Sequence, residues 1–82
     1  MNEEILWASA GELAARIRAR DLSPIEVMAS TLARAEVVQA ACNPFITIDG
    51  DRAMASAKVA EDAVMAGDKL GPLHGVPISV KD

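Results

Sequence analysis

The chain has 82 residues, a formal net charge of −4 and a single cysteine, Cys42. This length fits one small domain, and no apolar run approaches the roughly 20 residues that span a membrane. The negative charge argues against a protein that binds nucleic acid directly, and the lone cysteine excludes an internal disulfide and fits a reduced, cytoplasmic setting. Because aromatic residues make up only 2% of the chain, we expect a thin core that packs against further protein.

The first predicted helix covers residues 10–20. Ser9 and Glu12 have the spacing of a capping box, in which each residue satisfies a free amide at the start of the helix. The apolar positions of this segment recur every three to four residues and predict one buried face, formed by Leu13, Ala14 and Ile17.

Three arginines and the cysteine have simple structural interpretations. Arg16, Arg18 and Arg20 are too few for a nucleic-acid site, and we interpret them as solvated cations near the helix C-terminus. No histidine pattern accompanies Cys42, so we interpret it as a small buried hydrophobic residue and not as a nucleophile.

The second predicted helix covers residues 24–40. Ser23 is the expected N-cap, Pro24 suits the first helical position, and Glu26 completes a second capping box. The expected apolar stripe consists of Met28, Thr31, Leu32, Ala35 and Val38, widened by Val27 and Val37.

A short strand and a third helix are predicted next. Residues 45–48 are β-branched or aromatic and lie between Pro44 and a turn, which indicates a strand. Asp49 or Asp51 is expected to cap a helix over residues 52–66, and Gly67 to end it in the left-handed conformation. Small residues form the expected buried face of this helix: Ala53, Ala57, Ala60 and Val64.

The last part of the chain is predicted to be a loop over residues 67–76 and a strand over residues 77–81. Strand, helix and strand in this order predict a parallel βαβ unit and therefore an α/β fold. Two strands do not make a stable sheet, so we expect the remaining strands of the sheet to come from outside the chain.

Lys81 is the candidate catalytic residue. At the end of a central strand its ammonium would be partly desolvated, which lowers its pKa and would let it act as a general base; alternatively it is a solvated charge at a strand edge. His74 is interpreted as a structural hydrogen-bonding group and Ser79 as a residue that packs or hydrogen-bonds locally. The spacing of residues indicates no metal site, phosphate loop or dinucleotide-binding motif, so no cofactor is expected.

The final block GPLHGVPISVKD, residues 71–82, resembles the N-terminal conserved block of the amidase signature family. SAGELA at residues 9–14, LSPIEV at residues 22–27 and NPF at residues 43–45 resemble the same family in the same order. The resemblance implies an amidohydrolase with an α/β fold around a large mixed sheet and with a Ser-Ser-Lys triad, in which Lys81 matches the catalytic lysine. The serines of that triad belong to a Gly/Ser-rich region that this sequence does not contain.

The resemblance therefore implies that residues 1–82 are the N-terminal part of a single amidase domain whose parent acts on a small amide, and that the chain alone is inactive. Two alternatives stay open. The parent could be the amidase subunit of a glutamine-dependent tRNA amidotransferase, or the chain could be a non-catalytic helical interaction module, for which self-association is possible.

Overall fold

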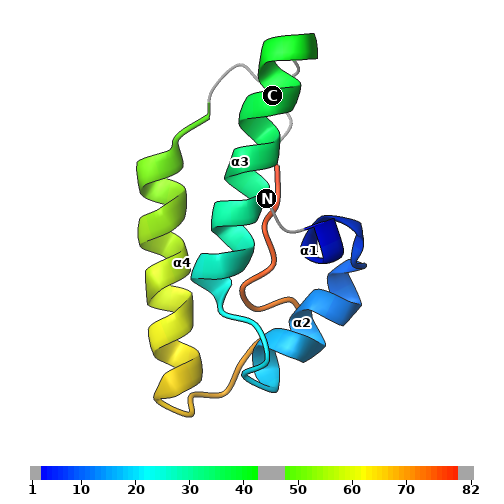
Figure 1. Ribbon diagram of the computed structural model, residues 1–82. Coiled ribbons are helices and arrows are strands. Elements are labelled where there is room, and N and C mark those ends of the chain that lie inside the picture. The colour runs from blue at the N-terminus through cyan, green and yellow to red at the C-terminus, as the bar shows by residue number, and fades with distance from the viewer. Residues whose placement is uncertain (1–2, 43–47, 80–82) are drawn as a thin grey trace.

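The computed structural model describes residues 3–42 and 48–79. In these residues it contains the helices α1 (Glu3–Trp7), α2 (Ala10–Arg18), α3 (Pro24–Cys42) and α4 (Gly50–Met65). The long helices α3 and α4 lie side by side and run in opposite directions, and α1 and α2 lie on the other side of α3 (Figure 1). After α4 the chain passes α2 and returns along α3 (Figure 1).

The predicted starts of α2 and α3 are confirmed, whereas α4 begins at Gly50, two residues before the predicted start. In each of the three helices the side chain of the N-cap residue accepts a hydrogen bond from a free amide of the first turn. Ser9 Oγ accepts from the Glu12 amide at 3.1 Å, and Ser23 Oγ accepts from the Ile25 amide at 3.1 Å. Of the two candidates for the third helix, Asp49 is the cap and accepts from the amide of Arg52 at 3.1 Å.

Two helices end in the same hydrogen-bonded motif, in which the residue after the C-cap has positive φ. Gly67 fills this position after α4 with φ 77°, as predicted. Arg20 fills it after α2 with φ 64°, and its amide donates to the Ile17 carbonyl at 3.0 Å. The predicted helix 10–20 therefore ends two residues early, at Arg18.

The core lies where α1, α2, α3 and the end of α4 meet. Its buried hydrophobic cluster contains Ile5, Leu13, Ile17, Leu22, Val27 and Val64, with Ala8, Leu70 and Val76 packed against it. The predicted face of α2 is confirmed, since Leu13, Ala14 and Ile17 are buried. The predicted face of α4 is confirmed in part, since Ala57 and Val64 are buried and Ala53 and Ala60 are partly buried.

The predicted stripe of α3 is displaced by about one residue. The buried positions of α3 are Pro24, Val27 and Ser30, whereas Val37 is 50% exposed. All three buried positions lie in the first half of α3, and the later apolar positions of this helix are at most partly buried.

The predicted α/β class is wrong for the part of the chain that the structure describes, which is helical and contains no strand. Ile48 and residues 77–79 lie outside any strand, and the other residues of the two predicted strands, 45–47 and 80–81, lie outside the described residues. A strand needs a hydrogen-bonded neighbour. Without one, residues 76–77 pack on the helices instead.

None of the described helices is long and apolar enough to cross a membrane.

Candidate functional site

Residues 71–79, which we call the strap, form the described part of the segment that the sequence indicates as functional. The strap begins with two successive turns, in which the His74 amide donates to the Gly71 carbonyl at 3.3 Å and the Val76 amide donates to the Leu73 carbonyl at 3.1 Å. Arg18 Nη2 also donates to the Gly71 carbonyl, at 3.1 Å. The start of the strap is therefore attached to the C-terminal end of α2.

Gly75 lies against the core. Its φ of 82° is a conformation that residues with a side chain rarely adopt. A Cβ atom at Gly75 would lie 2.9 Å from Ile17 Cδ1 and 3.1 Å from Pro24 Cγ. Both Ile17 and Pro24 are among the most deeply buried side chains of the described chain. Only glycine fits here without displacing the core, which gives a physical reason for glycine in the motif.

His74 attaches the strap to α4. Its Nε2 atom lies 2.8 Å from the Ala60 carbonyl oxygen in a partly buried contact. A carbonyl oxygen can only accept a hydrogen bond, so Nε2 carries the proton and donates it. The interpretation of His74 as a structural hydrogen-bonding group is confirmed.

Beyond Gly75 the strap enters an apolar surface. Val76 packs against the buried cluster, and Val76 and Pro77 help to line an open depression of about 280 Å³. The rest of its lining comes from α1, α2 and α3 and from the α1–α2 connection: Ile5, Leu6, Ala8, Ala10, Leu13 and Thr31. Farther on, the Ile78 side chain is 83% exposed.

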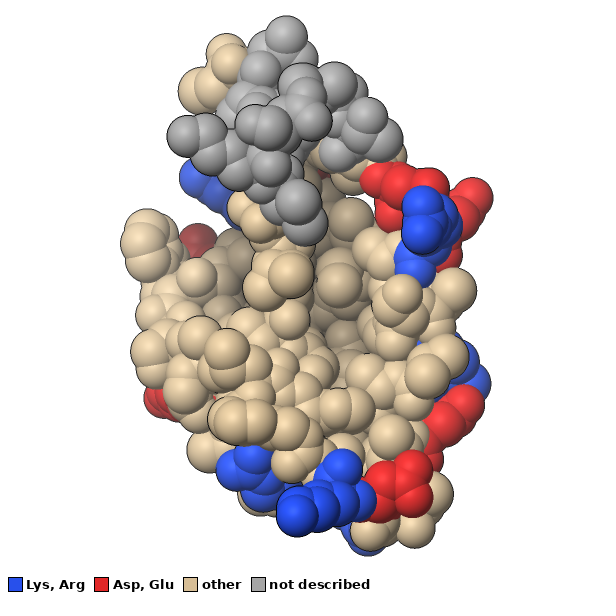
Figure 2. Space-filling model, turned by 180° about the vertical axis from the view of Figure 1, so that it is seen from behind, with Lys and Arg blue, Asp and Glu red and all other residues tan. Residues whose placement is uncertain are grey.

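Charged side chains lie toward the margins of the face in Figure 2, and uncharged residues form most of its hollowed centre. Among the described residues, no group of three or more His, Cys, Asp or Glu side chains is arranged to hold a metal ion.

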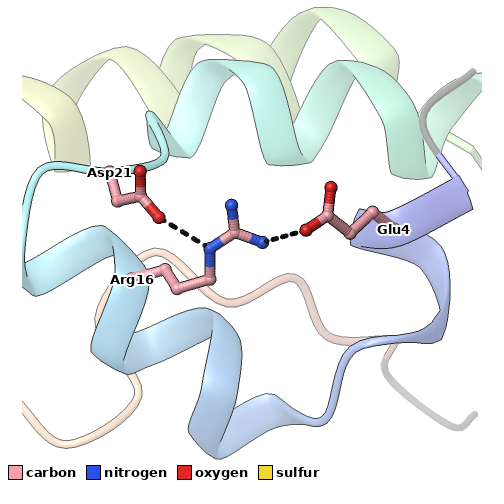
Figure 3. Close-up of polar contacts among 3 residues, drawn as sticks. All are labelled: Glu4, Arg16 and Asp21. Atoms are coloured by element: carbon pink, nitrogen blue, oxygen red, sulfur yellow. Dashed lines mark hydrogen bonds and ion pairs between the residues drawn. The ribbon is translucent and has the colours of Figure 1, made fainter.

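The three arginines of α2 and its C-terminus are not simply solvated, which corrects the expectation from sequence. Arg16 pairs with Asp21 at 2.9 Å and with Glu4 of α1 at 3.3 Å (Figure 3). Arg20 Nη2 donates to the Val64 carbonyl at 3.2 Å in the last turn of α4. A cation at this place is favoured by the α4 dipole. Together with Arg18, these side chains connect α2 to α1, to α4 and to the strap.

The predicted site residues have different outcomes. Lys81 lies outside the described residues, and Ser79 is exposed at the end of the strap. Cys42 is exposed at the end of α3, so its interpretation as a buried hydrophobic residue is wrong. The contribution of Arg18 to the strap was missed, because its acceptor is a backbone carbonyl 53 residues away in sequence.

Comparison with known proteins identifies the class. The amidase family model matches residues 26–82. This chain therefore belongs to the amidase family, the amidase-signature enzymes that its motifs resemble.

The relatives include two differently named groups of proteins. The chain is 37% identical over 79 residues to the glutamyl-tRNA(Gln) amidotransferase A subunit of Streptomyces coelicolor, and the match covers 96% of this chain and 16% of the relative. It is also 37% identical over 83 residues to an acylamidase of Rhodococcus erythropolis, and this match covers 100% of this chain and 17% of the relative.

A third relative, the glutamyl-tRNA(Gln) amidotransferase A subunit of Aromatoleum aromaticum, is 43% identical over 75 residues, or 92% of this chain and 15% of the relative. The chain thus spans about one sixth of the length of these curated relatives. No solved structure matches the chain significantly.

Proposed function

We propose that this chain is the N-terminal part of an amidase domain that cleaves a carbon–nitrogen amide bond, and that Lys81 is the lysine of a Ser-Ser-Lys triad. The proposal is supported by family membership, because the family match runs through residue 82 and includes the block that carries Lys81. The length of the relatives supports the view that the two serines belong to sequence outside these 82 residues.

In the proposed mechanism the neutral Lys81 amine takes a proton from a bridging serine. That serine takes the proton of the nucleophilic serine, whose oxygen attacks the amide carbonyl. The amine leaves with a proton, and water or another amine then releases the acyl group. A serine hydroxyl is a weak nucleophile at neutral pH unless a positioned base removes its proton during attack, which is the reason a lysine is needed.

The strap supports this role on physical grounds. Residues 71–77 are attached to α2 and α4 and pack on the core, and Lys81 follows Ser79 by only two residues in sequence. A catalytic group must be held close to its productive geometry. The attachment of residues 71–77, which ends four residues before Lys81 in sequence, contributes to this requirement.

The test uses the full-length protein that contains this chain. We expect Lys81→Ala to lower amide cleavage by about 10⁴-fold or more, as removal of a member of a catalytic triad does elsewhere. Lys69→Ala, at an exposed lysine of the same chain, should leave the rate unchanged. Near-normal cleavage by Lys81→Ala would refute the assignment.

We expect residues 1–82 alone to be inactive. The isolated chain is to be assayed on simple aliphatic amides with sensitive detection of ammonia. Turnover above background that disappears in Lys81→Ala would contradict the assignment of the serines to another part of the protein.

The second candidate is the amidase subunit of a glutamine-dependent tRNA amidotransferase. The names of the relatives from Streptomyces coelicolor and Aromatoleum aromaticum favour this candidate. The acylamidase favours the first candidate, and its sequence identity to this chain equals that of the Streptomyces coelicolor relative. The two candidates differ in the fate of the nitrogen. Ammonia release from glutamine that depends on a co-purifying partner protein supports the amidotransferase, and partner-independent hydrolysis of simple amides supports the amidase.

A further inference from the structure

We propose that His74 is a positioning residue for amide cleavage. Its Nε2 atom donates a hydrogen bond to the Ala60 carbonyl. This bond sets the distance between the strap and α4, and so the direction in which the chain continues toward Lys81. This inference rests on the proposed function for its catalytic consequence. The hydrogen bond of His74 Nε2 to the Ala60 carbonyl, which we call the tether, rests on geometry alone.

The strap is held from two sides. Arg18 attaches its beginning to α2, and Gly75 packs on Ile17 of α2 and on Pro24 of α3. On the other side, the hydrogen bond of His74 to the Ala60 carbonyl, at 2.8 Å, joins the strap to α4. A segment held from one side only could rotate about that side, and the bond to α4 removes this freedom.

His74 occupies the position at which the strap changes direction. It immediately precedes Gly75, the residue with positive φ that turns the chain into the core. His74 is also bonded through its backbone, because its amide donates to the Gly71 carbonyl at 3.3 Å. Backbone and side chain are thus both held at the residue where the direction of the strap is decided. A displacement of about 1 Å in a supporting residue is enough to cost a large factor in rate.

The Nε2 donor of His74 can be separated from the bulk of its ring. The ring places a proton on an atom three bonds beyond Cβ, and the Nε2 amide of glutamine is also three bonds beyond Cβ and can donate. Leucine has similar bulk and no donor. His74→Gln and His74→Leu therefore form a matched pair that distinguishes the hydrogen bond from the volume of the side chain.

The tether is tested by amide hydrogen exchange in the full-length protein that contains this chain. We expect exchange of the Val76 amide, which donates to Leu73, to be roughly 5- to 10-fold faster in His74→Leu, the ratio that the net contribution of one hydrogen bond predicts. His74→Gln should exchange at close to the normal rate. Nitrogen NMR of the imidazole should show a proton on Nε2. Unchanged exchange in His74→Leu, or a neutral ring protonated on Nδ1 only, would overturn the tether.

The catalytic consequence is tested in the full-length protein. We expect His74→Leu to lower kcat at least 10-fold with little change in KM, and His74→Gln to restore most of the loss, because the interaction acts on the position of the base and not on substrate binding. Asp49→Ala, which removes a helix cap away from the strap, is the control for general loss of stability. Equal losses of kcat in Asp49→Ala and His74→Leu would overturn the positioning role.

The two proposals fail in different ways. Near-normal cleavage by Lys81→Ala would refute the proposed function and the catalytic part of this inference, whereas the exchange experiment would still decide the tether. Loss of cleavage in Lys81→Ala together with normal kcat in His74→Leu would refute the positioning role alone.

Discussion

Gly75 lies so close to Ile17 that a Cβ atom on Gly75 would be 2.9 Å from Ile17 Cδ1. Gly75→Ala therefore combines two costs, the positive φ of 82° and the displacement of a buried side chain. We expect a loss of roughly 2–4 kcal/mol in the free energy of unfolding. The loss can be measured by urea denaturation followed by circular dichroism.

The control for this prediction is Gly67→Ala. Gly67 has a similar φ of 77°, but a Cβ atom there would have no neighbour within 4 Å. Only the backbone cost remains, about 1 kcal/mol. Equal losses in the two variants would show that the strap does not press against Ile17 in solution.

Arg20 is the second testable position, because it has positive φ and its side chain donates to the Val64 carbonyl. Arg20→Ala keeps the unfavourable backbone and loses the hydrogen bond, so we expect it to destabilise the chain by about 0.5–1.5 kcal/mol. Arg20→Gly loses the same bond but relieves the backbone, so it should be about 1 kcal/mol more stable than Arg20→Ala. The comparison requires thermal melts of both variants, and an alanine variant as stable as the glycine variant would contradict it.

Asp49→Ala should destabilise the chain by about 1 kcal/mol, because it removes the oxygen that accepts from the Arg52 amide at the start of α4. Asp51 lies in the first turn, where its charge is favoured by the helix dipole, so Asp51→Ala should cost a smaller amount, about 0.3–0.5 kcal/mol. Denaturation of the two variants under identical conditions measures the difference. A larger loss in Asp51→Ala would show that the cap is assigned to the wrong aspartate.

Arg16 is predicted to stabilise α1 in a way that depends on salt and not on pH near neutrality. The hydrogen bond to Asp21, and then the charges of Asp21, Glu4 and Glu12, raise the pKa of the Arg16 guanidinium above its ordinary value. A raised pKa of a cationic group contributes stability that is complete below its ordinary pKa and is lost only as pH rises through the folded value. For arginine that loss lies far above neutral pH.

We therefore expect Arg16→Gln to lower the melting temperature by the same amount at pH 7 and pH 9, and by less at high salt, because exposed ion pairs are screened. Exchange of the α1 amides should become faster. The control is Lys58→Gln, since Lys58 pairs with Asp62 within one helix at 3.1 Å and should not affect α1. A pH-dependent effect in this interval, or unchanged α1 exchange, would contradict the prediction.

The sequence predicts the long helices of this fold well because the signals that start and end them are local. Ser23 and Pro24 start α3, Asp49 starts α4, and Gly67 ends it. α1 was missed because five residues with a single buried side chain, Ile5, are too few to show a helical period.

Strand prediction failed for a different reason. A short β-branched segment becomes a strand only if a neighbour supplies hydrogen bonds, and local composition does not report that neighbour. At the candidate site, the motif indicates the segment, and the glycine and histidine are recognisable within it. The contacts of Gly75 with Ile17 and of His74 with Ala60 depend on how distant helices pack, and no sequence spacing shows them.

Three side chains that join distant elements, Arg18, Arg20 and His74, donate to backbone carbonyls and not to side chains. Every residue type offers a carbonyl, so Ala60 and Val64 can change identity during evolution while the acceptors remain. Selection therefore does not require the donor residue and the acceptor residue to change together. Correlated substitutions between the two residues of each contact should be rare among homologues. The donor residues alone should be retained where these contacts are needed for stability or activity.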